Sequence, residues 1–160
     1  MSISLRPLGD DAISPLFELL QNEDLYRYLT FPPPRSLDEL AHRLEVDVRP
    51  EGHAFTVHRA EKPELPIGFC RYRIEGPNKY EIGYMIGRDF WGQGYATCVV
   101  AALLKELAIR FGVGVVLAAA DIGNVASIRA LERSGFLYSG FSETLLKREG
   151  SFNLEYARPL

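Results

Sequence analysis

The segment 84–97 constrains the fold more than any other, because the hydrophobic period changes abruptly on either side of it. Before its turn, residues 80–86 are rich in β-branched and aromatic side chains, as in a strand. After the turn, apolar residues recur at helical spacing over residues 99–111. Gly92 and Gly94 lack a Cβ, so the backbone between these two elements can turn sharply. The segment therefore predicts a strand, a tight turn and a long helix in direct succession.

This glycine turn has the features of an anion-binding site. The first N–H groups of a helix are unpaired, and the helix dipole adds partial positive charge at the same end. Together with the N–H groups of the turn they can hold a pyrophosphate. The glycines could instead serve only the geometry of the turn. The pattern is neither a P-loop nor the dinucleotide fingerprint, since no Gly-Lys-Ser/Thr follows and Thr97 stands where a third glycine would be required.

The rest of the chain predicts an α/β (α+β) fold with a mixed sheet of about seven strands, mostly antiparallel and flanked by helices. The element order is β-α-α-β-β-β-α-β-α-β-β, with further strands at residues 2–7, 54–60, 67–74, 113–120, 136–141 and 152–157. Residues 113–120 are almost wholly apolar, which predicts a strand buried on both faces. No repeat or linker interrupts this order, so we expect one domain over residues 1–160.

Composition excludes several classes of partner and site. The net charge of −3 comes from scattered residues, so we expect no nucleic-acid partner. The N-terminus does not resemble a signal peptide, and no apolar run approaches the ~20 residues that span a bilayer, so we expect a cytoplasmic protein and no membrane partner. Cys70 and Cys98 are too few for a disulfide scaffold. The histidines lack zinc-ligand spacing, so we expect no metal.

Four motifs in register resemble the GNAT superfamily of N-acetyltransferases. Trp91-Gly-Gln-Gly-Tyr-Ala96 is similar to motif A of that family, Gln/Arg-X-X-Gly-X-Gly/Ala, with Trp in the leading place. The other motifs are Leu5-Arg-Pro-Leu8, Glu81-Ile-Gly-Tyr84, and Asn124-Val-Ala-Ser127 followed by Arg133-Ser-Gly-Phe136. They resemble the branch of the ribosomal-protein N-terminal acetyltransferases, and the resemblance covers essentially all 160 residues.

The resemblance implies acetyl-CoA as acyl donor and a sheet that splays between its fourth and fifth strands to admit the pantetheine arm. Backbone groups of Tyr84, Met85 and Ile86 would then pair with that arm. Asn124 would bind the pantetheine near the thioester, although it could equally be the N-cap of its helix. The pyrophosphate would be held by backbone N–H groups of Trp91, Gly92, Gln93, Gly94, Tyr95, Ala96 and Thr97.

Two residues are candidates for the chemistry. Glu81 is the candidate general base, because an amine attacks a thioester only when it is neutral and a carboxylate can take its proton. The alternative for Glu81 is a solvated residue or a structural ion pair. Ser127 is the candidate hydrogen-bond donor to the departing thiolate, and its alternative is a hydroxyl bonded back to its own helix. In other branches of the family, a tyrosine at the position of Leu131 acts as the general acid. In this chain the general acid would have to be Ser127, a tyrosine such as Tyr138, or water.

The function that the resemblance implies is direct transfer of an acetyl group to a primary amine, on a protein N-terminus or a small molecule, within a ternary complex. The acceptor would enter beside residues 26–34, Glu81 and the hairpin formed by the last two predicted strands, 136–141 and 152–157. Homodimers are frequent in the family. The alternative is a non-catalytic acyl-CoA-binding module of the same fold. Two departures from the family favour this alternative: Leu131 replaces the tyrosine of other branches, and Cys98 replaces a glutamate that is frequent in this branch.

Overall fold

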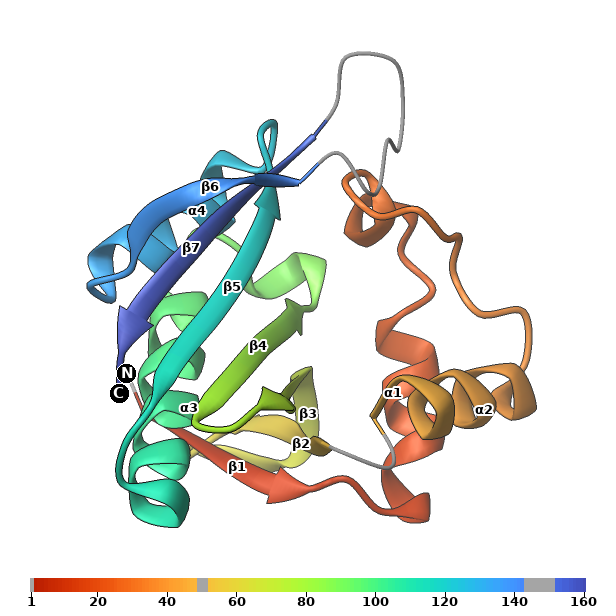
Figure 1. Ribbon diagram of the computed structural model, residues 1–160. Coiled ribbons are helices and arrows are strands. Elements are labelled where there is room, and N and C mark those ends of the chain that lie inside the picture. Colours follow the sequence, from red (N-terminus) through yellow and green to blue (C-terminus); the bar gives the residue numbers. More distant parts are fainter. Residues whose placement is uncertain (1, 49–51, 143–151) are drawn as a thin grey trace.

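The computed structural model describes residues 2–48, 52–142 and 152–160. The strands of this described part form one sheet in the order β1-β2-β3-β4-β5-β7-β6, with helices on both of its faces (Figure 1). The strands are β1 (Ile3–Pro7), β2 (Gly52–Arg59), β3 (Lys62–Gly76), β4 (Lys79–Ile86), β5 (Val115–Asp121), β6 (Leu137–Ser142) and β7 (Asn153–Pro159). The α-helices are α1 (Ile13–Leu19), α2 (Leu37–Val48), α3 (Tyr95–Phe111) and α4 (Val125–Arg133).

The predicted order of elements and the mixed α/β sheet are confirmed. Neighbouring strands run antiparallel except for β4 and β5, which run parallel. One boundary was predicted wrongly, since the strand expected over residues 67–74 begins at Lys62 in β3 and includes Pro63 and Pro66. The register between β2 and β3 shifts at His58, and such a bulge accommodates prolines that cannot donate to the ladder. Residues 147–151, which we predict to connect the last two strands as a hairpin, lie outside the described residues.

The prediction that the fifth strand is buried on both faces is wrong. In β5, Val116, Ala118 and Ala120 are buried, whereas Val115 and Ala119 are exposed. The buried residues belong to the same core cluster as Leu103 and other residues of α3. The reason is that only one face of β5 packs against this core, so its side chains alternate in burial despite being apolar on both faces.

Two hydrophobic cores lie on opposite faces of the sheet. The larger core packs α3 and α4 against the sheet and includes Ile82 and Ile86 of β4. The smaller core packs α1 and α2, and Met85 of β4 packs against it. Successive side chains of a strand point to opposite faces. Residue 84 of β4 therefore points toward α3 and α4, and residues 81 and 83 point toward the face that carries α1 and α2.

Strands β4 and β5 separate soon after they meet. They pair only at Lys79–Val115, Tyr80–Val116 and Glu81–Leu117. Beyond this point β4 remains paired with β3, and β5 remains paired with β7, but the two strands diverge from each other (Figure 1). The predicted splay between the fourth and fifth strands is thus confirmed, and we call this gap the β4–β5 opening. In the part of the chain that the structure describes, no helix is long and apolar enough to cross a membrane.

Candidate functional site

The backbone of β4 presents alternate residues to the β4–β5 opening. The N–H of Gly87 donates to the carbonyl of Ile67, on the β3 side, at 2.8 Å. The carbonyl of Asn78 accepts from the N–H of Val115, on the β5 side, also at 2.8 Å. Because the direction of backbone groups alternates along a strand, even-numbered residues of β4 face the opening and odd-numbered ones face β3.

This alternation divides the three residues that were predicted to bind the pantetheine arm. The backbone groups of Tyr84 and Ile86 point toward the opening. Those of Met85 point toward β3, where Met85 is the register partner of Phe69. The side chain of Trp91 reaches back to this strand, since its indole N–H donates to the carbonyl of Ile86 at 2.7 Å. The groups that remain available at the opening are therefore those of Tyr84 and the N–H of Ile86.

The glycine turn leads into α3 with positive φ angles at Gly92 (+73°) and Gly94 (+85°). A Cβ added at either glycine would meet no atom within 4 Å, so the glycines are required for backbone conformation and not for packing within the protein. Gly94 is the N-cap of α3 and makes no side-chain capping hydrogen bond. The first N–H groups of this 17-residue helix therefore have no capping side chain at Gly94, which is the arrangement that an anion site requires.

Asn124 and Ser127 stand on the other side of the opening, where β5 leads into α4. The Asn124 side-chain oxygen accepts a hydrogen bond from the N–H of Ser127 at 3.2 Å. The alternative interpretation of Asn124 as a helix N-cap is therefore confirmed, and its amide N–H₂ group can still donate to a ligand. Among the described residues, the Ser127 hydroxyl makes no hydrogen bond back to its own helix.

The side chain of Tyr84 is a part of the site that sequence reasoning missed. Its hydroxyl oxygen is buried and makes no hydrogen bond among the described residues. Burial raises the pKa of Tyr84, and the nearby Ser127 hydroxyl partly offsets this. The sequence signal that could have revealed it is the alternation of side-chain direction along β4, which places Tyr84 and Glu81 on opposite faces of the sheet. The sequence predicted a role for the backbone of Tyr84 but none for its side chain.

Glu81 occupies the last residue pair before the strands diverge, on the face that carries α1 and α2. Its Oε1 accepts from Arg73 at 2.9 Å and from Arg71 at 3.4 Å. The alternative interpretation of Glu81 as part of an ion pair is thus what the structure contains. Both arginines bond the same oxygen, so within the described residues Oε2 is left without a hydrogen bond. The guanidinium of Arg71 also lies over Gly83, whose missing Cβ would be 3.6 Å from Arg71 Cζ.

The other candidates have simpler surroundings. Leu131 is buried in the larger core, and Tyr138 is 59% exposed on β6, with its ring edge-to-face against Tyr156. Cys70 is buried and Cys98 is partly exposed, and both are free thiols. In residues 2–48, 52–142 and 152–160, no group of three or more His, Cys, Asp or Glu side chains could hold a metal ion.

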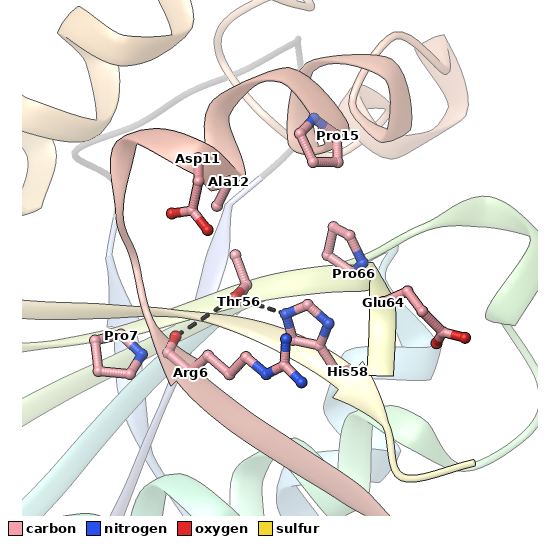
Figure 2. A pocket seen from close by; sticks show the side chains of 9 residues that line it. All are labelled: Arg6, Pro7, Asp11, Ala12, Pro15, Thr56, His58, Glu64 and Pro66. Carbon is pink, nitrogen blue, oxygen red and sulfur yellow. Dashed lines mark hydrogen bonds between the residues drawn. The ribbon is translucent and has the colours of Figure 1, made fainter. Parts of the chain in front are cut away.

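A second hollow lies apart from the β4–β5 opening, where β1, β2 and the start of β3 face the first turns after β1 (Figure 2). A ring nitrogen of buried His58 lies 2.9 Å from Thr56 Oγ1, which also donates to the carbonyl of Arg6 at 3.4 Å. Burial and the charge of Arg6 lower the pKa of His58. No predicted site residue is among its lining residues, which are Arg6, Pro7, Asp11, Ala12, Pro15, Thr56, His58, Glu64 and Pro66.

Comparison with known proteins gives a consistent result. Residues 2–137 match the family described as acetyltransferase (GNAT) domain. The uncharacterized protein YkkB of Bacillus subtilis (strain 168) is 40% identical over 72 residues, which are 45% of this chain and only 42% of that protein. The uncharacterized N-acetyltransferase p20 of Bacillus licheniformis is 23% identical over 154 residues, 92% of this chain and 86% of the relative.

The fold is also that of solved structures. The spermidine N-acetyltransferase from Vibrio cholerae, solved in complex with CoA and spermine, superposes with a TM-score of 0.83 and 18% identity. The superposition covers 98% of this chain and 95% of the other.

Proposed function

Since the chain belongs to the GNAT acetyltransferase family, we propose that it moves an acetyl group from acetyl-CoA to a primary amine. The family and the N-acetyltransferase relative support an acyltransferase. The observation that carries the proposal is the β4–β5 opening beside the uncapped start of α3. An extended arm that ends in a pyrophosphate suits this combination, because the strand edge offers a hydrogen-bonding ladder and the helix N-terminus attracts an anion.

The donor is bound mainly through backbone groups in this proposal. Tyr84 and Ile86 pair with the pantetheine arm, and the side-chain amide of Asn124 donates to it from the α4 side. The N–H groups of residues 91–97 hold the pyrophosphate. Support comes from the positive φ angles of the glycine turn and from the absence of a capping side chain at Gly94.

The reaction proceeds by direct attack in a ternary complex. The neutral amine attacks the thioester carbon, and the amine proton passes to Glu81 Oε2, directly or through a water. The C–S bond then breaks, its electron pair stays on sulfur, and the Ser127 hydroxyl donates a hydrogen bond to the thiolate. The two arginines bound to Oε1 fix the orientation of the Glu81 carboxylate. No metal takes part.

The acceptor is an amine on a protein N-terminus or on a small molecule. The spermidine acetyltransferase with the same fold was solved with spermine, an amine. The motifs around Glu81, Trp91 and Asn124 favour the branch of the ribosomal-protein N-terminal acetyltransferases. We further propose a cytoplasmic protein that needs neither nucleic acid nor membrane and acts as a monomer or homodimer.

Two measurements test the proposal. Titration calorimetry should give micromolar binding of acetyl-CoA and much weaker binding of NADH and ATP. Saturating acetyl-CoA should also raise the melting temperature, because at about 100 times Kd a ligand adds about 2.7 kcal/mol to the stability of the native state. Release of free thiol with a panel of peptides, polyamines and amino sugars then identifies the acceptor. Binding without thiol release for any amine would indicate a non-catalytic acyl-CoA-binding module, and absence of binding would contradict the cofactor assignment.

A further inference from the structure

Tyr84 borders the β4–β5 opening, beyond the last residue pair between these two strands. It belongs to β4 and packs against the larger core on the α3 side of the sheet. Ser127 belongs to the first turns of α4, which follows β5 on the opposite side of the opening. The two residues thus come from elements on opposite sides of the gap in which we place the pantetheine arm.

The hydroxyl of Tyr84 is buried without a hydrogen bond among the described residues. Such an unsatisfied group is costly, so buried hydroxyls are normally paired in a finished structure. The Ser127 hydroxyl lies close enough to act on the ionisation of Tyr84. It makes no hydrogen bond to its own helix in the described part of the chain, so its orientation is not fixed from that side. Each hydroxyl therefore offers the other the partner that it lacks.

The direction of this contact follows from the chemistry of the two groups. Burial raises the pKa of Tyr84 by more than the Ser127 hydroxyl lowers it, so the Tyr84 hydroxyl keeps its proton at neutral pH and can donate. A serine hydroxyl has one proton and two lone pairs. When Tyr84 donates to a lone pair of Ser127, the serine proton is free to point into the opening.

We propose that Tyr84 is a positioning residue that donates a hydrogen bond to Ser127 and thereby directs the Ser127 O–H at the sulfur of the acyl donor. The inference rests on the proposed function and deepens it. When the C–S bond breaks, the electron pair stays on sulfur and Ser127 stabilises it with that hydrogen bond. Tyr84 gives up no proton. Leu131 is buried in the core on α4, so the tyrosine that supports the leaving group comes from the strand and not from that helix.

The test compares Tyr84→Phe, which removes only the hydroxyl, with a control on the same strand. Tyr80 lies on the same face at the paired end of β4, and its hydroxyl donates to the carbonyl of Val113 at 3.4 Å. The first readout is the pH titration of the thiol of bound CoA, followed by the ultraviolet absorbance of the thiolate. We expect the thiolate to form at higher pH in Tyr84→Phe and Ser127→Ala than in the wild type or Tyr80→Phe. This readout needs no acceptor.

The second readout is turnover with an active amine. We expect Tyr84→Phe to lower kcat by roughly threefold to tenfold, the effect of one hydrogen bond in the transition state, without raising KM for acetyl-CoA. The double variant with Ser127→Ala should be no slower than Ser127→Ala alone, because Tyr84 acts only through Ser127. An acyl donor whose leaving thiol is more acidic needs less stabilisation of the thiolate. With such a donor, the difference in kcat between wild type and Tyr84→Phe should become smaller.

The outcomes separate this inference from the proposed function. A CoA thiol that titrates identically in wild type and Tyr84→Phe overturns the role of Tyr84 and leaves the acetyltransferase proposal intact. Equal losses of turnover in Tyr84→Phe and Tyr80→Phe, with no change in thiol titration, show a structural effect and also overturn it. If the wild-type protein does not bind CoA, both proposals fail. Ser127→Ala provides the same titration test without any change on β4.

Discussion

The two edges of β4 differ more than any other two regions of this molecule. On the β3 side the strand is paired from Ile86–Gly68 to Lys79–Gly76. On the β5 side it is paired only as far as Glu81. The same strand therefore supports the sheet along one whole edge, whereas its other edge has no partner strand beyond Glu81. An unpaired strand edge at the rim of a sheet is a liability, because another chain can pair with it, but here the unpaired edge lies inside the sheet, between β4 and β5.

This comparison makes a general prediction. Changes on the open edge, or at the elements that border it, should alter turnover or donor affinity while stability is kept. Changes on the edge paired with β3 should alter stability while the site of the folded protein is kept. The following three substitutions test this division in order of decreasing expected effect.

The largest effect is expected for Glu81→Gln, at the point where the open edge begins. If Glu81 accepts the amine proton, the variant should lower turnover by roughly 10²–10⁴-fold, because the amide cannot act as a base. Steady-state kinetics with an active amine measures this, and acetyl-CoA affinity should stay the same. Glu75→Gln is the matched control, since Glu75 pairs with Arg73 at 3.4 Å but lies beyond the opening. Normal turnover in Glu81→Gln would exclude Glu81 as the base.

An intermediate effect is expected for Gly68→Ala on the paired edge. The added Cβ would collide with the carbonyl oxygen of Met85 and would lie 3.1 Å from Ile86 Cα. Forcing the strands apart should cost about 1–3 kcal/mol in the free energy of unfolding, measured by chemical denaturation. Gly83→Ala is the control, because its Cβ would meet Arg71 only at ordinary contact distances. A loss of acetyl-CoA affinity without a loss of stability in Gly68→Ala would contradict the division between the two edges.

The smallest effect is expected for Gly94→Val at the turn that borders the opening. A β-branched side chain at φ +85° is strained, and it would crowd the space in which we place the pyrophosphate. We expect acetyl-CoA affinity to fall about tenfold, which is about 1.4 kcal/mol. Gly112→Val is a close control, since Gly112 ends the same helix at φ +78° and also has open space around its Cβ position. If the two variants bind acetyl-CoA with equal affinity by calorimetry, Gly94 serves only the geometry of the turn and not the binding of the pyrophosphate.

Sequence reasoning reached the fold because the informative patterns are local. Hydrophobic period, the glycine turn and the motif order predicted the succession of elements, and the resemblance implied the splay. Details that depend on register were out of reach. The hairpin between β3 and β4 is irregular between Ile74 and Gly76 and turns at Asn78, whose φ is +54°. Only this register places Arg73 opposite Glu81 and turns the backbone of Met85 away from the opening.

The same limit explains the missed side chains. Tyr84 and Ser127 lie on elements from opposite sides of the β4–β5 opening, and no spacing within the sequence encodes the distance between segments that do not pair. The exposed outer side chains of β5 were missed for a related reason, since apolar composition does not reveal which face of a strand another element covers. Prediction was thus reliable for the succession of elements and weak for burial, register and contacts between elements.

With acetyl-CoA bound in the β4–β5 opening as we propose, the three-pair ladder between the two strands would set how deep the donor extends into the sheet. A strand rises about 3.3 Å per residue, so one more residue pair would shorten the opening by about that length. The acyl group lies beyond the sulfur and would meet the Glu81–Leu117 pair first. We therefore expect the selection of acyl chain length to depend on the register of two strands, and a shift of that register would change the donor that fits without the replacement of any side chain.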